Sequence, residues 1–492
     1  MFLGIDLGTS AVKAILVDDR ERIVGSAAVA LTVERPRPSW SEQNPQDWWD
    51  ATLEAVDTLA SRHPVQVSAV AGIGLSGQMH GAVLLDRDAK VLRPCILWND
   101  SRADDECGLL ERALPDLGAI AGNRAMPGFT APKVLWVRRN EPDIFARTAT
   151  VLLPKAWLRL RLTGEAIEDM SDASGTLWLD VGARTWSEAA LAATGLSLAS
   201  VPRLVAGSEP AGRLRRELAA RWRMRVPPVL AGGAGDNAAG AVALGAIRPG
   251  SAFVSLGTSG VVWATTDGFR PYPRGAVHAF CHALPDVWHQ MGVTLSAAAS
   301  LAWWARINGL GEAELLSELD GRIIGPSEAT FLPYLSGERT PHNDVTMRGV
   351  LAGLSHDASR ASLTQAVIEG VAFSMRDCVR ALAESGTEIT VAGVIGGGAR
   401  SRTWIAILSS VLAIPLNRLA EAEHGAALGA ARLARLAATG ESPDAVCRAP
   451  PIIETVAPEP ALTDAYERRF TRYLELSSAA RENSPRRATA RR

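Results

Sequence analysis

Lysine is scarce in this chain of 492 residues, and the few lysines are poorly placed for one common task. They stand at Lys13, Lys90, Lys133 and Lys155, and none of them follows a glycine. The nucleotide-binding loop G-x-x-x-x-G-K-[ST] is therefore absent from the sequence. If the protein binds a nucleotide, backbone N–H groups and a metal ion have to hold the phosphates.

Cysteine, net charge and long apolar runs are also in short supply. The five cysteines form no C-x-x-C pair, which is typical of a reducing compartment rather than of a disulfide frame. A formal net charge of −2 gives no global field that would favour nucleic acid or an anionic membrane. The longest weakly charged stretch, 226–247, contains prolines and an Asp-Asn pair and does not read as a membrane span. The chain begins with an apparent strand and no basic segment, so we expect a cytoplasmic protein without a signal peptide.

The sequence contains a short internal repeat. Residues 2–12 (FLGIDLGTSAV) return half a chain later as 252–262 (AFVSLGTSGVV). Each copy is a short apolar run, then Gly-Thr-Ser, then a β-branched run, a pattern that predicts a hairpin. Two such copies favour two similarly built halves. Two unrelated strands that share a common turn tripeptide would give the same pattern.

Strand-like runs alternate with helical periodicity along the chain, which predicts an α/β fold with mixed or parallel sheets. The strand-like runs include 69–75, 82–85 and 389–395, and the helix-like runs include 46–61, 103–113, 295–307 and 363–385. Turn-forming Arg-Pro-Gly at 248–250 marks a domain boundary. We therefore predict an N-terminal domain over 1–246, a C-terminal domain over 247–440 and an extension over 441–492. The Arg-rich end of this extension, from 481 on, is expected to lack fixed structure.

The first hairpin carries an acid that the second lacks. Asp6 ends the strand just before Gly8, Thr9 and Ser10, so its carboxylate would lie beside turn N–H groups that can wrap a phosphate oxyanion. A carboxylate there can hold a hydrated Mg²⁺ ion on a phosphate. A capped turn, with Asp6 satisfying local amides, is the alternative. The second copy has Ser255 at this position, so it could grip phosphate without holding a metal ion.

A run of small residues at 231–241 surrounds a single acid, Asp236. Small residues let a ligand approach the backbone closely. A carboxylate in such a place can accept the proton of an alcohol, which is the general-base role in phosphoryl transfer. The residues that follow are typical of a helix opening at Asp236, so a helix N-cap alone is the competing interpretation.

Two further glycine-rich segments differ in what they indicate. Residues 72–77 match the dinucleotide fingerprint G-x-G-x-x-G, but the residues after them predict a turn into a strand rather than a helix. His80 and Gly81, just beyond, suit a sugar pocket better, although a satisfied structural histidine is the alternative. Three glycines at 396–398 follow a strand and favour the binding of a nucleotide against the backbone over a plain turn.

These segments resemble, in order, the motifs of the FGGY carbohydrate kinases. The matching segments are 4–10 (GIDLGTS), 77–81 (GQMHG), 97–100 (LWND), 235–237 (GDN), 255–260 (SLGTSG), 331–342 (FLPYLSGERTPH) and 396–400 (GGGAR). The resemblance runs from the first residue to about residue 436. Several of these motifs are weak singly, and their order makes them specific.

The resemblance implies two ribonuclease-H-like domains of the actin-like ATPase class, with ATP and sugar meeting in an interdomain cleft. It implies that Asp236 is the base and that Asp6 acts through Mg²⁺. The sugar-binding residues that it implies are Met79, His80, Trp98, Asn99 and Asn237. The ATP-binding residues that it implies are Gly8, Thr9, Ser10, Gly257, Thr258, Gly397, Gly398 and Ser401. The charged residues 421–424 depart from the family pattern and leave the nucleotide contacts there open.

The implied reaction is the MgATP-dependent phosphorylation of a ketopentose, D-xylulose, at its terminal hydroxyl. Three alternatives stay open: the same chemistry on ribulose, gluconate or glycerol, an actin-like ATPase that serves as a filament or chaperone module, and a sugar sensor without activity. The ATPase would need the hairpins but not Asp236, and the sensor would lack the base. Sugar and ATP are the implied partners, with no nucleic acid and no membrane. A homodimer is compatible with the sequence, which does not fix the oligomeric state.

Overall fold

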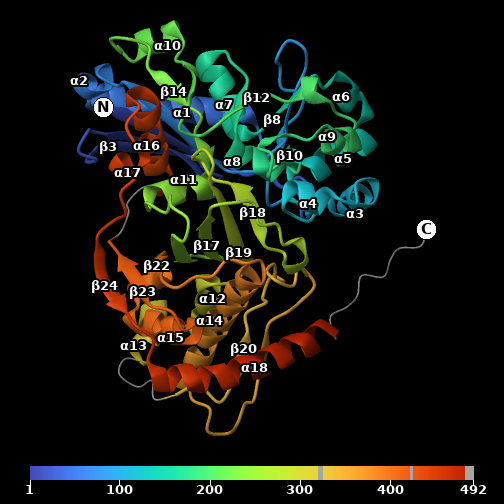
Figure 1. The fold of residues 1–492 in the computed structure, drawn as a ribbon, viewed down its shortest axis with the longest axis vertical. Helices are drawn as coiled ribbons and strands as arrows, with labels where there is room; N and C mark the ends of the chain where they lie inside the picture. Colours follow the sequence, from blue (N-terminus) through green and yellow to red (C-terminus); the bar gives the residue numbers. More distant parts are fainter. Residues whose placement is uncertain (320–324, 421–424, 483–492) are drawn as a thin grey trace.

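The chain folds into two α/β halves, each built around its own mixed sheet (Figure 1). The computed structural model describes residues 1–319, 325–420 and 425–482. The expectations about 421–424 and about the end of the tail, 483–492, lie outside these described residues. The predicted α/β fold class is confirmed.

The first sheet has the strand order β13-β14-β5-β1-β2-β3, with β15 also alongside β5. β1, β14 and β15 are all parallel to β5, whereas β2 is antiparallel to β1. Its strands are β1 (Phe2–Leu7), β2 (Ala11–Val17), β3 (Ile23–Ala30), β5 (Gly72–Gly77), β13 (Pro210–Arg213), β14 (Val229–Ala231) and β15 (Ala234–Gly235). The carboxyl ends of β1, β5 and β15 therefore meet at one edge of the sheet.

The two faces of this sheet differ because successive side chains of a strand point to opposite sides. On one face, Leu3, Ile5 and Ile73 join a core that includes residues of the helices α1 and α7. On the other face, Gly4 and Gly74 present no side chain, and α16 packs there. The helices packed around the sheet are α1 (Pro45–Arg62), α7 (Pro154–Thr163), α11 (Asp236–Ala243) and α16 (Gly425–Thr439).

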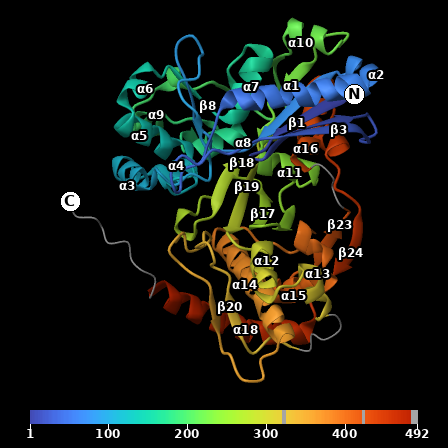
Figure 2. The same cartoon turned by 180° about the vertical axis from the view of Figure 1, so that it is seen from behind.

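Helix α16 lies between strands β23 and β24 of the second sheet in the chain but packs on the first sheet (Figure 2). A Cβ atom added to Gly74 would lie 1.8 Å from the carbonyl oxygen of Ala430 in α16. Gly429 of α16 meets α11 in the same way, because a Cβ there would lie 1.8 Å from the carbonyl oxygen of Ala239. The helix is thus held against both the sheet and α11 at distances that only glycine permits.

The second sheet has the strand order β18-β19-β17-β16-β22-β23-β24. Its strands are β16 (Ala252–Leu256), β17 (Gly260–Thr266), β18 (His278–Cys281), β19 (Trp288–Thr294), β22 (Ala392–Ile395), β23 (Leu416–Leu419) and β24 (Ile452–Val456). Buried apolar residues join it to α12 (Ala298–Asn308), α14 (Arg360–Glu384), α15 (Arg402–Leu412) and α18 (Pro460–Glu482). In Figure 1 this half forms the lower part of the molecule.

The two predicted hairpins are confirmed, and each occupies the same place in its sheet. β1 pairs antiparallel with β2 and parallel with β5, and β16 pairs antiparallel with β17 and parallel with β22. The internal repeat in the sequence therefore corresponds to a structural repeat. The predicted domain boundary near residue 246 stays a prediction, and α16, which that division assigns to the second domain, packs on the first sheet.

Most of the helices between β5 and β14 extend the first half sideways, at the upper right of Figure 1, whereas α10 lies at its upper left. They are α3 (Asp104–Ala113), α4 (Leu117–Ala121), α5 (Thr130–Asn140), α6 (Pro142–Arg147), α8 (Met170–Ala173), α9 (Glu188–Thr194) and α10 (Arg216–Arg221), together with α7. The helix-like runs predicted from periodicity correspond to α1, α3, α12 and α14. Across the described residues, no helix is both long and apolar enough to cross a bilayer.

Candidate active site

The two candidate catalytic carboxylates lie where parallel strands end. Asp6 of β1 is in register with Ser76 of β5, and Gly235 of β15 is in register with Gly77. Ser76 Oγ donates a hydrogen bond to Asp6 Oδ1 at 2.8 Å. Asp236 directly follows β15 as the first residue of α11. The strand order therefore brings the two acids, far apart in sequence, to one edge of the sheet.

Asp236 has one occupied and one unoccupied carboxylate oxygen. Its Oδ1 accepts hydrogen bonds from the backbone N–H of Asn237 at 2.7 Å and from Asn237 Nδ2 at 2.9 Å. In the described part of the chain, Oδ2 has no hydrogen-bond partner. The N-cap position of α11 belongs to Gly235, so the interpretation of Asp236 as an N-cap alone is wrong.

The surroundings of Asp236 make it a weak acid. Burial, followed by the charge of Asp6, raises the pKa of Asp236 to about 7, against the two hydrogen bonds from Asn237. Burial also raises the pKa of Asp6, which the hydrogen bond from Ser76 opposes. A carboxylate whose pKa lies near neutrality can both take up and release a proton at working pH, as a general base must.

A cavity of about 180 Å³ lies between the two halves, next to Asp236. At roughly 30 Å³ per water molecule, this volume suits a small polar ligand. From the first half it is lined by Met79, His80, Trp98, Asp236 and Asn237. From the second half it is lined by Ser259, Val261, His278, Phe280, Met291, Val293 and Arg339. The structure thus brings together the predicted sugar-binding residues except Asn99, which is exposed in the turn after Trp98 and does not line the cavity.

Both histidines of this cavity are neutral. His80 Nδ1 lies 2.7 Å from the carbonyl oxygen of Gly175, which can only accept, so Nδ1 carries the proton. His278 Nδ1 lies 2.7 Å from Asn123 Oδ1 and donates to it in the same way. Burial lowers the pKa of His80 to about 3 and that of His278 well below its usual value. Each ring therefore keeps an unprotonated Nε2, which can only accept a hydrogen bond.

The turn of the first hairpin is tied to this cavity. Thr9 Oγ1 donates to Gln78 Oε1 at 2.9 Å and accepts from Trp98 Nε1 at 3.0 Å, so the hydroxyl is already engaged. The backbone N–H groups of Thr9 and Ser10 have no partner among the residues that the structure describes. Two adjacent N–H groups of this kind form an anion-binding turn.

A second cavity, of about 440 Å³, lies between α11 and the second sheet. Its lining includes Gly240 of α11, Leu244 at the end of that helix, Gly396 and Gly397 after β22, and Leu419 of β23. Gly396 has a φ of +93°, and a Cβ there would approach the end of β16 to within 2.7 Å. Glycine is therefore required where this largely apolar cavity meets the second hairpin.

The predicted ATP-binding residues around this cavity lie in different environments. The N–H groups of Gly257 and Thr258, in the turn of the second hairpin, have no partner among the described residues. Gly397 lines the cavity, whereas Gly398 is buried against Leu256 and Trp404. The Ser401 hydroxyl caps α15 by accepting a hydrogen bond from the backbone N–H of Trp404, three residues further on, at 3.2 Å. A role of Gly398 and Ser401 in binding ATP stays a prediction.

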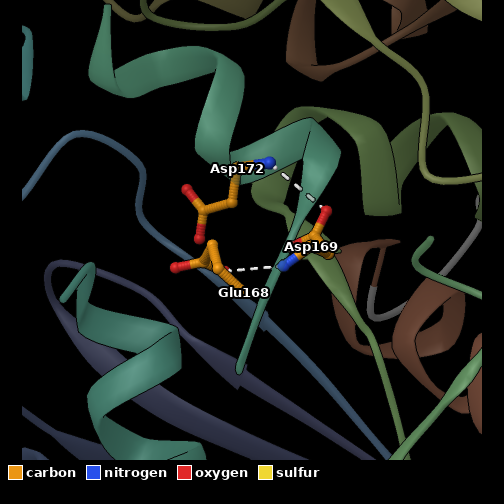
Figure 3. Close-up of side chains that lie close together, drawn as sticks. All are labelled: Glu168, Asp169 and Asp172. Carbon is orange, nitrogen blue, oxygen red and sulfur yellow. Dashed lines mark hydrogen bonds between the residues drawn. The ribbon is translucent and has the colours of Figure 1, made fainter. Parts of the chain in front are cut away.

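A buried group of charges adjoins the segment that carries Asp236. Figure 3 shows its three carboxylates close together. Glu168, Asp169 and Asp172 offer carboxylate oxygens within 4.8 Å of one another, a spacing that a metal ion could use. The ammonium group of Lys155 takes that place, bonded to Glu168 and lying 2.7 Å from Asp169 and 3.5 Å from Asp172. Burial alone would lower the pKa of Lys155, but the three carboxylates together raise it. The cluster is therefore a buried ion-pair network rather than a metal site.

This network reaches the loop that carries Asp236. Asp169 Oδ1 accepts from Ser171 Oγ at 2.5 Å, and Ser171 Oγ accepts from the N–H of Gly235 at 3.2 Å. Arg159, one helical turn after Lys155 in α7, donates to the carbonyl oxygen of Ala231 at 2.6 Å. The buried charges thus hold both ends of the segment that leads to Asp236.

Sequence reasoning missed the network and the wall of the cavity that comes from the second half. The charges of the network are spread over α7, β9 (Ile167–Asp169) and α8, and only the fold brings them together. The spacing of His278, Cys281 and His282 is compatible with a metal site on one face of a helix, but without a second pair of ligands the sequence favours a structural role. In the structure, 278–281 is the strand β18 and His278 lines the cavity. Arg339 lies within the motif at 331–342, which was the one available signal for it.

Profiles of two protein domains match this chain. The N-terminal domain of the FGGY family of carbohydrate kinases matches residues 1–243, and the C-terminal domain of the same family matches residues 252–438. The chain therefore belongs to the FGGY family of carbohydrate kinases. The predicted family and the predicted enzyme class, a carbohydrate kinase, are confirmed.

Among individual proteins, the chain is similar to xylulose kinases. It is 49% identical over 442 residues to the xylulose kinase of Escherichia coli (strain K12), a match that covers 90% of this chain and 91% of that protein. It is 39% identical to the xylulose kinase of Bacillus subtilis (strain 168), over 88% of this chain and 87% of that protein. The crystal structure of a xyloylose kinase from Brucella ovis matches with a TM-score of 0.96 and 54% identity, covering 98% of this chain and 99% of that one.

Proposed function

We propose that this carbohydrate kinase transfers the γ-phosphoryl group of ATP to the terminal hydroxyl of D-xylulose and forms D-xylulose 5-phosphate. The similar proteins named xylulose kinases support this substrate. The observation that carries the proposal is the position of Asp236, which has an unpartnered Oδ2 among the described residues and lines a small cavity between the two halves.

The chemistry follows from this position. Asp236 Oδ2 takes the proton of the C5 hydroxyl as that oxygen forms its bond to the γ-phosphorus. The bond from the γ-phosphorus to the bridging oxygen breaks, and ADP leaves with the electron pair. The two hydrogen bonds from Asn237 hold Oδ1 and so fix the direction in which Oδ2 points.

Backbone groups can supply phosphate-binding donors that the two buried lysines cannot. Lys133 is buried and donates to the carbonyl oxygens of His80 and Gly128, and Lys155 is enclosed in its ion-pair network, so neither reaches a phosphate. The free N–H groups of the two hairpin turns would bind phosphate oxygens from both halves. The larger cavity, with Gly397 at its edge, would accept the adenosine end.

A divalent metal ion suits the pair of acids at this edge. Asp6 and Asp236 repel each other, as the raised pKa of Asp236 indicates, and a dication would relieve that repulsion. Asp6 would hold Mg²⁺ through water, since its Oδ1 already accepts from Ser76. The ion, when bound, supplies charge neutralisation on the phosphates.

The test is the exchange of Asp236 for Asn, with Asp236→Ala as a second variant. We expect phosphorylation of D-xylulose to fall by about 10²- to 10⁴-fold, because the base is lost while its shape is kept. Binding of sugar and nucleotide, measured by calorimetry, should remain. Near-normal turnover in a coupled ADP-release assay would remove Asp236 from the role of base.

A substrate panel tests the other half of the proposal. D-Xylulose, D-ribulose, L-ribulose and glycerol are compared at equal enzyme concentration through kcat/KM. D-Xylulose should have the highest value. A higher value for any of the others would transfer the same chemistry to that substrate.

A further inference from the structure

The first turn of α5 is hydrogen-bonded to the backbone of a residue that lines the sugar cavity. That residue is His80, in the loop between β5 and β6 (Val83–Leu85). Lys133 Nζ donates to the carbonyl oxygen of His80 at 2.9 Å, and Thr130 Oγ1 donates to the same oxygen at 3.1 Å. Thr130 and Lys133 are three residues apart in α5, so both side chains lie on one face of the helix. One face of α5 thus holds the main chain of His80.

His80 is restrained in its side chain as well. Its Nδ1 donates to the carbonyl oxygen of Gly175 at 2.7 Å, and its ring packs against Phe129, the residue before α5, with the ring centroids 4.6 Å apart. The φ of His80 is +70°, a left-handed conformation that costs free energy in a residue with a side chain. These contacts hold His80 in one backbone conformation and one ring orientation. Among the described residues, Nε2 has no partner and is left for a ligand.

Lys133 also reaches a second loop of the cavity. Its Nζ donates to the carbonyl oxygen of Gly128 at 2.7 Å. Gly128 lies against the backbone of Trp98, since a Cβ added to it would be 2.5 Å from the carbonyl oxygen of Trp98. Trp98 lines the cavity, as His80 does. The amine of Lys133 therefore joins the His80 loop to the segment that supports Trp98.

A lysine is an expensive choice for this position. Lys133 is fully buried, and in the part of the chain that the structure describes its amine bonds to two carbonyl oxygens and to no carboxylate. Burial lowers the pKa of the amine to about 7. The amine also belongs to the first turn of α5, where the helix dipole disfavours a positive charge. An apolar side chain of similar length would avoid these costs. The stability of the fold therefore does not explain the amine, whereas the position of the His80 loop does.

We propose that Lys133 is a positioning residue for the sugar. Through the carbonyl group of His80 it fixes the direction of His80 Nε2, which accepts a hydrogen bond from a hydroxyl group of the sugar. Lys133 is not among the residues that line the cavity, so it acts through His80 and not by contact. This inference rests on the proposed function, because it takes His80 as a contact of D-xylulose.

The experiment starts with the Lys133→Met variant, which keeps the length of the side chain and removes both donors. We expect the KM for D-xylulose to rise about 3- to 10-fold, as for the loss of one hydrogen bond. The kcat and the KM for ATP should stay at their wild-type values, because Asp236 and the two hairpin turns keep their own contacts. Steady-state rates from the coupled ADP-release assay measure all three constants.

A double-mutant cycle separates positioning from a general structural effect. His80→Ala removes the ring but leaves the carbonyl group that Lys133 binds. If Lys133 acts through the ring, Lys133→Met should cause no further rise in the KM for D-xylulose when it is added to His80→Ala. A structural role would instead raise the KM by the same factor in both backgrounds, and that result would overturn the inference.

Two further variants complete the design. Lys90→Met, at an exposed lysine, should behave as the wild type. Thr130→Val removes the other donor to the carbonyl oxygen of His80. If circular dichroism shows Lys133→Met to be unfolded at the assay temperature, the same cycle is run with Thr130→Val, and the same results are expected.

The remaining outcomes count against the inference. An unchanged KM for D-xylulose means that the His80 loop keeps its position without this donor. A fall in kcat at unchanged KM means that α5 acts on phosphoryl transfer and not on the sugar. A wild-type enzyme that does not phosphorylate D-xylulose would reject the proposed function together with this inference, whereas an active wild type with an additive cycle would reject this inference alone.

Discussion

At the scale of single residues, the environment of Asp236 determines what the carboxylate can do. Its ordinary pKa would leave it ionised and weakly basic at neutral pH, and burial next to Asp6 changes that. This effect could not be predicted from the sequence, because Asp6 and Asp236 meet only through the pairing of β1, β5 and β15. The acids themselves, by contrast, could be predicted from the small residues and turns around them.

The raised pKa of Asp236 predicts a pH dependence. The base must be unprotonated to act, so kcat/KM for D-xylulose should be constant above about pH 7 and fall about tenfold per unit below it. Initial rates at low D-xylulose concentration from pH 5 to 9 measure this. The residual turnover of Asp236→Asn should lack the acidic limb, and a wild-type profile that stays flat down to pH 5 would contradict the assignment.

Other residues of the site show which cavity-lining residues could be predicted from the sequence and which could not. Met79, His80 and Trp98 belong to recognisable segments, and all three line the cavity. Asn99, predicted with them, is exposed in a turn and does not line the cavity. Arg339 and His278 reach the cavity only because the second sheet closes against the first half, and no local pattern reports such a contact.

At the scale of elements, the glycines of β5 illustrate the same limit. Residues 72–77 match a dinucleotide-binding fingerprint, but the residues after them predict a turn and a strand rather than the helix that this fingerprint requires. In the structure, Gly74 alternates with the core residues Ile73 and Leu75 and leaves room for α16. The packing of a helix that lies so far from β5 in the sequence could not be inferred from the sequence of the strand alone.

The close approach of α16 predicts the effect of one methyl group. A Cβ in Gly74→Ala would lie 1.8 Å from the backbone of α16, so the helix must move. We expect the unfolding free energy to fall by about 1–3 kcal/mol, as for other overpacked sites. Urea and thermal unfolding midpoints measure this change. Gly268→Ala, where nothing lies within 4 Å of the added Cβ, is the matched control, and equal midpoints for the two variants would contradict the packing argument.

The buried network predicts a larger effect. Lys155→Met leaves Glu168, Asp169 and Asp172 close together without their ammonium partner. Removing one side of a buried ion pair costs about 3–5 kcal/mol, so we expect a marked drop in the thermal midpoint. Lys90→Met, at an exposed lysine, should leave the midpoint unchanged. Adding Glu168→Gln to Lys155→Met should restore part of the loss, and a variant as stable as the wild type would mean that the network is not needed.

At the scale of the whole molecule, the sugar cavity is shared between the halves, which predicts closure on the ligands. A ligand bound in this cavity would contact residues of both halves and draw them together, and closure excludes water from the phosphoryl group. We expect the radius of gyration to fall when D-xylulose and a non-hydrolysable ATP analogue are both present. Small-angle X-ray scattering measures this, with each ligand alone as the control. Unchanged scattering with both ligands would contradict a closing motion.

The fold class and the repeated hairpin could be predicted from the sequence because both depend on local patterns, the apolar runs and the Gly-Thr-Ser turns. The crossing of α16 back to the first sheet could not, since it depends on contacts between residues at opposite ends of the chain.

That crossing sets the order in which the protein can be completed during its synthesis. Domains usually finish folding one after another as they leave the ribosome. Here the face of the first sheet at Gly4 and Gly74 stays uncovered until α16 has emerged, which happens only after the second sheet has been almost entirely translated. The first half of the nascent chain therefore cannot complete its packing until a helix encoded near the 3′ end of the coding sequence has been translated.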